Sequence, residues 1–113
     1  MKLIKAYIRH RKIEEKYDAL RKAGYCFMTF VECDGTGQYS DQEKEHISES
    51  YPFAEVYRVI KLEILAADEH VREIIKIIKL SGRTGHRGDG MVIISPVDEV
   101  YEVRTDETGI LAI

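Results

Sequence analysis

The sequence predicts an α+β domain in which an antiparallel sheet carries two helices on one face. Apolar residues recur with period two and then with period 3.6, in the order strand, helix, strand, long loop, strand, helix, strand. Leu3–Ile8 also resembles Val59–Ile64, and a helical segment follows each of them. Two β-α-β units of this kind interleave into a four-stranded sheet, the ferredoxin-like βαββαβ arrangement. We therefore expect residues 1–113 to form a single domain, large enough to bury one core.

The first β-α-β unit begins near the N-terminus. Apolar side chains alternate along residues 2–9, which predicts a strand. Residues 12–23 predict a helix, because apolar residues follow the spacing i, i+4, i+7 from Ile13, and Gly24 then suits a left-handed cap. Residues 25–33 predict a second strand that is apolar on both faces, so both of its faces need cover.

Helices supply the cover for one face of the predicted sheet. In a chain of this length, the most plausible cover for the other face is another subunit. Side chains such as Leu3, Tyr7 and Val31, or their alternates, are therefore expected to be buried between subunits.

The two cysteines, Cys26 and Cys33, lie seven residues apart on the predicted second strand. Odd spacing places them on opposite faces, which argues against an intrachain disulfide. We expect both to be buried structural residues.

The second β-α-β unit repeats the pattern. Residues 56–65 alternate as a strand, and Asp68 is a suitable N-cap for the helix that follows. Residues 91–94 predict the last core strand, which Pro96 ends, and residues 100–104 predict a short edge strand. The buried stripe of the second helix is expected to consist of Val71, Ile74, Ile75 and Ile78.

Two glycine-rich segments indicate an anion site. Arg83–Gly90 contains three glycines, a threonine hydroxyl and three basic side chains within eight residues. Glycine permits close backbone approach, and successive N–H groups in such a turn form a concave site for phosphate oxygens. A second cluster occurs at Asp34–Gly37. We expect the two clusters to meet in space, with a nucleotide between them.

The composition limits the other classes of function. The formal net charge is −3 and the charges are interleaved, which argues against nucleic acid as a partner. No apolar run approaches the roughly 20 residues that span a bilayer, so we expect a cytoplasmic protein without membrane insertion. The histidines show no metal-ligand spacing, and no catalytic constellation can be assembled. We therefore expect no metal site and no enzyme.

Taken together, these motifs resemble those of the P-II signalling family of trimeric regulators. The most specific match is Arg83–Gly90, which is similar to the family signature of Thr-Gly, two residues and Gly-Asp-Gly. Met28-Thr29, Glu32, Gly35-Thr36-Gly37, the long loop and Val103-Arg104-Thr105 also fit the family pattern in the correct order. The resemblance covers most of the chain. It implies a homotrimer that binds adenine nucleotides in clefts between subunits.

Carried over by position, the resemblance also implies the residues of the nucleotide site. Thr29 and Thr84 would contact the base or ribose, the backbone of the two glycine segments would approach the phosphates, and Arg104 would pair with phosphate across the interface. The full implied set is Thr29, Gly35, Thr36, Gly37, Gln38, Ile64, Arg83, Thr84, Gly85, Arg87, Gly88, Asp89, Gly90, Met91 and Arg104.

Departures from the family pattern change the expected ligand. Met91 stands where the family usually has a lysine that holds phosphate, and Glu102 stands where it usually has an arginine. Triphosphate binding should suffer most, so ADP, AMP or a cyclic nucleotide is expected at least as much as ATP. Tyr39 stands where a glutamine normally helps to hold Mg²⁺ and 2-oxoglutarate, which argues against 2-oxoglutarate sensing and leaves the role of Mg²⁺ open.

Residues 34–55 are expected to form a mobile loop that recognises a partner. Nothing periodic holds them in place, and long irregular segments inside compact domains are usually functional or disordered. A membrane transporter or a metabolic enzyme is the expected target. The residues expected to contact it are Tyr39, Ile47, Tyr51 and Phe53.

Several alternatives remain open from the sequence. They are a nitrogen-regulatory P-II protein that senses ATP, ADP and 2-oxoglutarate, a P-II-like protein linked to bicarbonate or inorganic carbon uptake, and a weak nucleotide hydrolase. A structural trimer similar to the copper-tolerance proteins of the same fold is a further alternative, but it would leave the Gly88-Asp89-Gly90 loop without a role.

Overall fold

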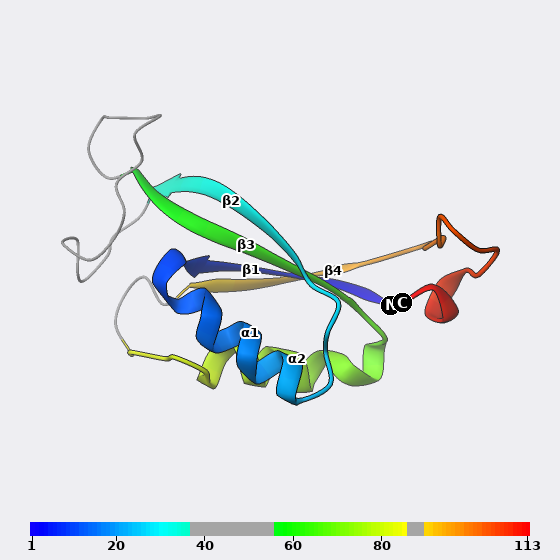
Figure 1. Ribbon diagram of the computed structural model, residues 1–113, viewed down its shortest axis with the longest axis horizontal. Coiled ribbons are helices and arrows are strands. Elements are labelled where there is room, and N and C mark those ends of the chain that lie inside the picture. The colour runs from blue at the N-terminus through cyan, green and yellow to red at the C-terminus, as the bar shows by residue number, and fades with distance from the viewer. Residues whose placement is uncertain (37–55, 86–89) are drawn as a thin grey trace.

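The computed structural model describes residues 1–36, 56–85 and 90–113. Its elements form two layers, a four-stranded sheet and a pair of helices that cover one face of it (Figure 1). The strands and helices follow the predicted β-α-β-β-α-β order, which confirms the expected α+β architecture. Their bounds are β1 Lys2–Arg9, α1 Ile13–Lys22, β2 Thr29–Thr36, β3 Val56–Ala66, α2 Val71–Leu80 and β4 Met91–Pro96, with the short 3-10 helices η1 His10–Lys12, η3 Asp68–His70 and η4 Gly109–Ala112.

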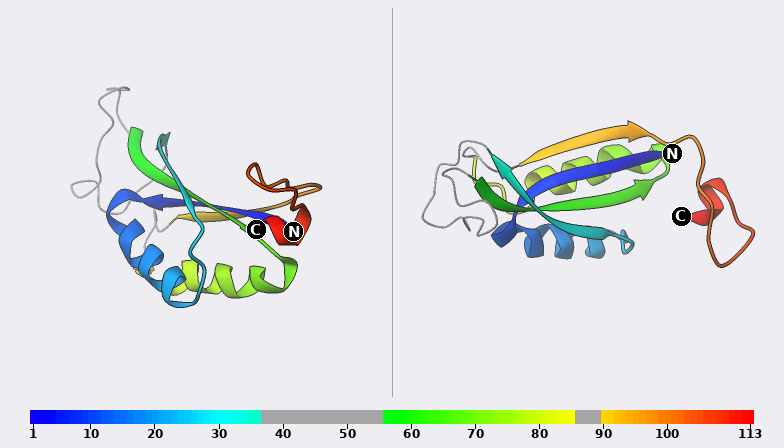
Figure 2. Two further views of the ribbon diagram at one scale, coloured as in Figure 1. Left: turned by 45° about the vertical axis from the view of Figure 1, so that its right-hand side comes forward. Right: turned by 90° about the horizontal axis from the view of Figure 1, so that it is seen from above.

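The sheet has the strand order β2-β3-β1-β4, and every pair of neighbours is antiparallel (Figure 2, right). Each half of the chain contributes one central and one edge strand, which is the interleaving that the internal repeat predicts. Along the central pair, Ile4 lies opposite Ile64 and Ala6 lies opposite Leu62. Residues directly opposite each other share a face of the sheet, so this register gathers the apolar side chains on one side.

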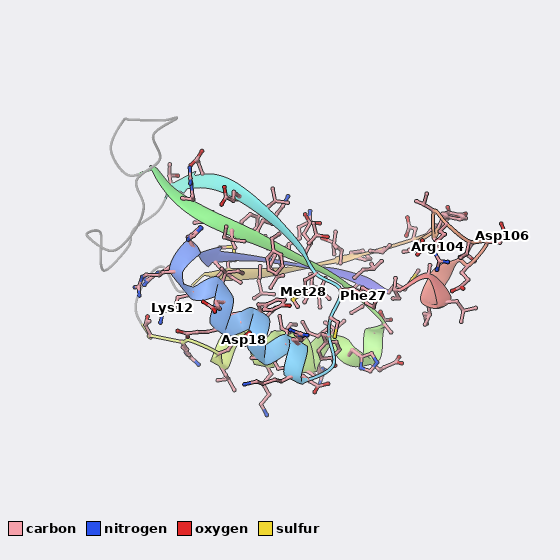
Figure 3. The ribbon with its side chains drawn as sticks, in the orientation of Figure 1. Lys12, Asp18, Phe27, Met28, Arg104 and Asp106 are labelled. Carbon is pink, nitrogen blue, oxygen red and sulfur yellow. The ribbon has the colours of Figure 1, made fainter. Side chains whose placement is uncertain are left out.

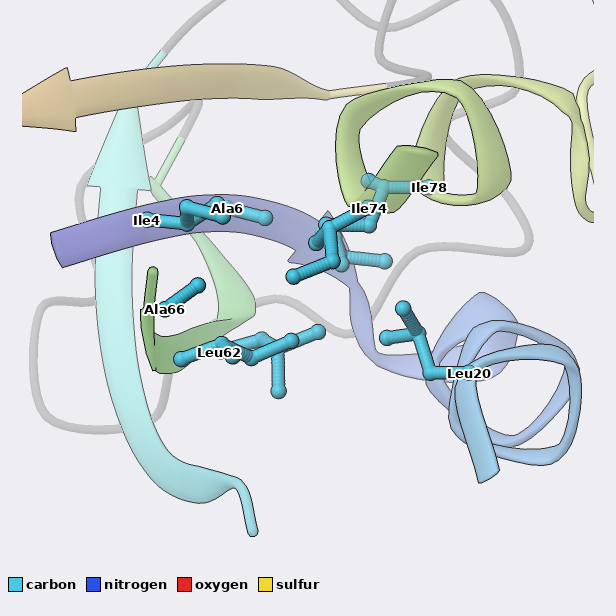
Figure 4. Close-up of a cluster of buried hydrophobic side chains, with 9 residues drawn as sticks. Ile4, Ala6, Leu20, Leu62, Ala66, Ile74 and Ile78 are labelled. Carbon is cyan, nitrogen blue, oxygen red and sulfur yellow. The ribbon is translucent and has the colours of Figure 1, made fainter. Parts of the chain in front are cut away.

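The hydrophobic core lies between that face and the two helices (Figure 4). The side chains of Leu20 from α1 and of Ile74 and Ile78 from α2 meet the sheet there, and each is at most 3% exposed. The predicted stripe of α2 is thus confirmed at Ile74 and Ile78, while Val71 and Ile75 are half-buried. The remaining core residues are Ile4, Ala6, Ile8, Leu62, Ile64 and Ala66.

Among the described residues, no helix covers the opposite face of the sheet, which we call the uncovered face. Leu3, Tyr7 and Val31 all lie on it, as predicted, because each is out of phase with the core positions of its strand. Val31 is 39% exposed and Met91, which is opposite Tyr7, is 63% exposed. The expected burial of this face by another subunit stays a prediction.

The second strand lies later in the chain than the apolar pattern predicts. Residues 25–28 precede it, because the chain turns at Gly24, where φ is 98°, and must first cross from the end of α1 to the edge of the sheet. Asp34–Thr36, predicted to begin the long loop, instead pair with residues 56–58 as the last residues of β2. The rest of that loop, residues 37–55, lies outside the described residues.

This shift also overturns the expected burial of the cysteines. Cys26 lies before the strand and is exposed, and Cys33 is half-buried on the uncovered face, opposite Val59. Both thiols are free, which agrees with the predicted absence of a disulfide between them.

The predicted N-cap at Asp68 is wrong. The 3-10 helix η3 precedes α2, and no side chain caps either of them. The Asp68 carboxylate instead accepts a hydrogen bond of 2.9 Å from the Met1 ammonium group. This hydrogen bond is the main reason why the pKa of Asp68 lies below its usual value.

The predicted edge strand over residues 100–104 is also wrong. The chain after β4 runs beyond the end of the sheet, where no neighbouring strand is available (Figure 2). A single bridge between Tyr101 and Thr108 and the 3-10 helix η4 follow instead. None of the helices in the described ranges is long and apolar enough to cross a membrane.

Replacing a core side chain should destabilise the protein strongly. Leu20 is fully buried, so Leu20→Ala is expected to cost about 2–5 kcal/mol of unfolding free energy through lost burial and the cavity that remains. Leu80→Ala is the matched control, because Leu80 is 56% exposed and should cost about 0.5 kcal/mol. Urea denaturation of both variants at one protein concentration would measure the difference, and equal costs would contradict the described core.

Candidate functional site

The two glycine clusters lie at the same end of the sheet. β2 ends at Thr36, and the chain enters β4 at Met91, whose partner Tyr7 is near the end of β1. We call this the loop end of the sheet, and the opposite end the far end. The antiparallel order of the strands therefore brings Gly35 and Gly90 to one end of the sheet.

Within one chain, however, the two clusters occupy opposite edges of the sheet. β2 and β4 are the edge strands, with β3 and β1 between them. Three strand spacings separate the edges by roughly 14 Å. The described residues of the two clusters thus share an end of the sheet without forming one compact site in a single chain.

A hollow at the loop end contains several of the predicted residues. It has a volume of about 290 Å³ and lies between the sheet and the ends of both helices. We call it the loop-end hollow. Its described lining consists of Ile8, Lys16, Ile78, Lys79, Arg83, Gly85, Gly90, Met91 and Val92.

Position 90, which lines this hollow, requires glycine. Its φ is 116°, which residues with a Cβ rarely adopt, and an added Cβ would overlap the carbonyl oxygen of Tyr7. The chain therefore enters β4 in close contact with the backbone of β1. Gly35 differs, because its φ is unstrained and an added Cβ would lie 3.8 Å from Val59, an ordinary contact.

Lys16 is a residue that the sequence reasoning missed. Its side chain is nearly fully buried, and its ammonium group donates hydrogen bonds to the carbonyl oxygens of Ile78 at 2.7 Å and Ser81 at 2.5 Å. These carbonyls belong to the last turn of α2 and the residue that follows it. The spacing gave a signal, because Lys16 lies four residues before Leu20, on the buried face of α1.

Two further described site residues lie at the far end of the sheet or in the tail. Thr29 begins β2, roughly 23 Å from Thr36 at the strand rise per residue. It lines a hollow of about 650 Å³, which we call the far-end hollow, together with Glu63, Glu102 and residues 111–113. Arg104 also lies beyond the far end, where its backbone N–H donates to Glu102 at 3.2 Å (Figure 3).

The other predicted residues do not join either group. Ile64 lies in the core and is 3% exposed, with its side chain on the helix-covered face. Thr84 is half-buried beside Gly85 in the segment between α2 and β4. Gly37, Gln38, Arg87, Gly88 and Asp89, and the loop residues Tyr39, Ile47, Tyr51 and Phe53, lie outside the described residues. In the described ranges, no three side chains of the His, Cys, Asp and Glu types cluster as a metal site would require.

A polar cluster outside both groups surrounds Tyr25. Its hydroxyl donates a short hydrogen bond to Glu73 and lies 3.4 Å from His70 Nδ1. The bond to Glu73 is the main cause that raises the pKa of Tyr25 to about 12, with smaller contributions from burial and from the negative charge of Glu73.

The fold is that of a small α+β domain, and the described candidate residues are divided between the two ends of its sheet. A family model described as "Nitrogen regulatory protein P-II" matches residues 1–107. The chain belongs to the P-II family of signalling and regulatory proteins.

Curated relatives agree with this assignment over at least 94% of their length. "Nitrogen fixation nifHD region GlnB-like protein 1" of Methanothermococcus thermolithotrophicus is 37% identical, over 97% of this chain and 100% of its own. "Nitrogen regulatory protein P-II" of Rhizobium meliloti is 34% identical over the full length of both. "Nitrogen regulatory protein P-II 2" of Methanothermobacter thermautotrophicus is 41% identical, over 96% of this chain and 94% of its own.

Substituting Gly90 should destabilise the protein more than substituting another glycine of similar backbone conformation. Gly90→Ala adds the overlap with Tyr7 to the strain of positive φ, so its cost should exceed the roughly 1 kcal/mol that the strain alone produces. Gly24→Ala is the control, because Gly24 has a φ of 98° and no atom within 4 Å of an added Cβ. Thermal unfolding would compare the variants, and equal shifts in Tm would contradict the close contact with β1.

The Tyr25–Glu73 hydrogen bond should make stability depend on alkaline pH. Because the folded pKa is raised above the unfolded value of 10.0 to about 12, the contribution is fully present below pH 10.0 and is lost as the pH rises through about 12. Tyr25→Phe should lack this dependence, and Glu73→Gln should return the pKa of Tyr25 toward its ordinary value. Tyrosinate absorbance during a pH titration would test this, and a late ionisation that persists in Tyr25→Phe would contradict it.

Proposed function

We propose that the protein is a regulator that binds an adenine nucleotide between copies of its own chain. The observation that carries the proposal is the division of the candidate residues between the two ends of the sheet. The loop end holds Gly35, Thr36 and Gly90, whereas Thr29 and Arg104 lie at the far end or beyond it. A ligand as small as a nucleotide would contact both groups if a second copy placed its far end beside the loop end of the first.

The uncovered sheet face supports such an assembly. Its edge strands expose large apolar side chains, namely Val31 on β2 and Met91 and Ile93 on β4. Apolar surface of this kind is normally buried against a partner. A head-to-tail arrangement of identical copies that closes on itself forms a ring, and the proposed assembly is a homotrimer.

Gly35 supports a ligand approach at the loop end. Neither its φ nor the space around its Cα requires glycine in the single chain. A glycine in an edge strand without such a requirement is consistent with close approach of a ligand or another backbone. In the proposed assembly, Gly35 and Thr36 contact the phosphate side of the nucleotide, and residues 37–55 carry the signal to a membrane transporter or a metabolic enzyme.

The ligand we propose is ADP or AMP in preference to ATP. Met91 lines the loop-end hollow where β4 begins, and Glu102 lines the far-end hollow. Neither side chain can neutralise additional phosphate charge. Isothermal titration with ATP, ADP, AMP and cyclic AMP tests the proposal, and the absence of binding by every nucleotide would overturn it.

A subunit-mixing experiment would test whether two copies share the site. Gly35→Asp should abolish nucleotide binding, because it places a carboxylate in the loop-end group. Arg104→Glu should abolish it as well, because it reverses the charge in the far-end group. Refolding the two variants together should restore about a quarter of the sites, because each restored site needs one intact half from each neighbour. If either variant alone binds as well as the unmodified protein, or if mixing restores nothing, the shared site is wrong.

A second candidate is a nitrogen-regulatory protein that senses ATP, ADP and 2-oxoglutarate. The names of the relatives favour this candidate, because they are described as nitrogen regulatory or nitrogen fixation proteins. Tight, Mg²⁺-dependent binding of 2-oxoglutarate would support this candidate over the first. Turnover assays with ATP and ADP would separate both candidates from a weak nucleotide hydrolase.

Placing a lysine at position 91 should shift the preference toward ATP. Met91→Lys adds a cation at the entry to β4, and a charged hydrogen bond to phosphate should strengthen ATP binding about tenfold relative to AMP. Glu99→Gln is the control for a general change in charge, because it changes the net charge by the same +1 and Glu99 is exposed and lines neither the loop-end nor the far-end hollow. Calorimetric titrations of both variants would measure the ratio, and an unchanged ratio in Met91→Lys would contradict the role of position 91.

A further inference from the structure

The loop-end hollow has a cationic lining on the side that faces the helices. Of its described lining residues, Lys16, Lys79 and Arg83 are basic and none is acidic. The carboxylate of Glu15 lies against Gly82, outside this described lining, and forms an ion pair of 3.5 Å with Lys12. The described wall of the hollow therefore presents positive charge that suits an anion.

The C-terminal end of α2 would normally oppose an anion at this place. The last carbonyl groups of a helix carry a partial negative charge. Lys16 donates to two of these oxygens, those of Ile78 and Ser81, and thus neutralises the helix end next to the hollow. The buried ammonium group of Lys16 therefore weakens the repulsion between these carbonyl oxygens and an anion. Arg83 and Lys79 can then attract the anion to the hollow.

The size of the hollow limits the group that it can hold. Its volume of about 290 Å³ lies at the lower end of the range for small-molecule sites. A phosphate group with bound water fits this volume better than a whole nucleotide does. Arginine and lysine are the usual side-chain donors to phosphate, and both are supplied here from the exposed surface of the last turn of α2 and the segment after it.

We propose that the loop-end hollow is a phosphate-group site, in which Arg83 and Lys79 contact the phosphate oxygens and Lys16 acts as a positioning residue. The phosphate group belongs either to the nucleotide or to a free phosphate ion. The inference rests on the proposed function only if the phosphate group belongs to the nucleotide. The new element is that Lys79 and Arg83 supply positive charge from α2 and the segment after it, whereas Met91 at the start of β4 supplies none.

The test compares phosphate binding by the unmodified protein and by the double variant Arg83→Gln, Lys79→Gln. Both side chains are exposed, so the double variant should fold normally, which circular dichroism would verify. Inorganic phosphate at constant ionic strength should bind the double variant about tenfold more weakly or worse. The matched control is Arg21→Gln, Lys76→Gln, which removes the same charges from exposed helix positions outside the hollow and should retain the original affinity.

Titrations with nucleotides distinguish the two sources of the phosphate group. For a nucleotide phosphate, the double variant should bind ATP and ADP about tenfold more weakly and adenosine unchanged, with inorganic phosphate competing. For a free ion, inorganic phosphate should still bind when nucleotide is saturating. Equal affinities of the double variant and the control for phosphate and for ATP would overturn the inference, even if nucleotide binding itself is confirmed. Loss of phosphate binding would support it even if no nucleotide binds.

Lys16 needs a readout that a structural role alone would not change. Lys16→Met should weaken phosphate binding at a temperature where circular dichroism shows the variant to be folded, and Lys16→Arg should restore it by keeping the charge. Two outcomes would contradict the proposal that Lys16 neutralises the end of α2. One is that Lys16→Met and Lys16→Arg both bind phosphate weakly, and the other is that both bind it as well as the unmodified protein.

Discussion

The register between β1 and β3 is the constraint on which the rest of the structure depends. Ile4, Ala6 and Ile8 lie opposite Ile64, Leu62 and Ile60, so one face of the sheet is continuous and apolar. A slip by one residue would exchange this face with the one that carries Lys5, Lys61 and Glu63. Both helices pack against the apolar face, and the same pairing determines which residues reach the loop end and which reach the far end of the sheet.

Most of the fold could be predicted from the sequence because its strongest patterns are local. The alternation in residues 2–9 and the apolar spacing of α2 survive in the structure because the same side chains face one core. The errors arise where a position depends on a distant contact. Thr36 is in a strand because β3 pairs with it, and the carboxylate of Asp68 is held by Met1 instead of capping a helix.

The candidate site could be predicted in part for the same reason. The glycine segments at Gly35 and Gly90 were visible as a motif, and the sheet places them at the same end. Their separation across two central strands follows from the strand order, which no short motif contains. Lys16 was missed because a charged residue on a helix is normally assumed to face solvent, whereas its partners are backbone carbonyls more than sixty residues away.

The hydrogen bonds of Lys16 also have a mechanical consequence. One ammonium group on α1 holds the carbonyls of Ile78 and Ser81, so α2 cannot slide along its axis past α1 without breaking both bonds. Leu20 and Ile74 hold the same pair of helices against the sheet through apolar packing. The two hydrogen bonds and this packing therefore fix the end of α2 relative to α1, and the segment that begins after Ser81 starts from a held position.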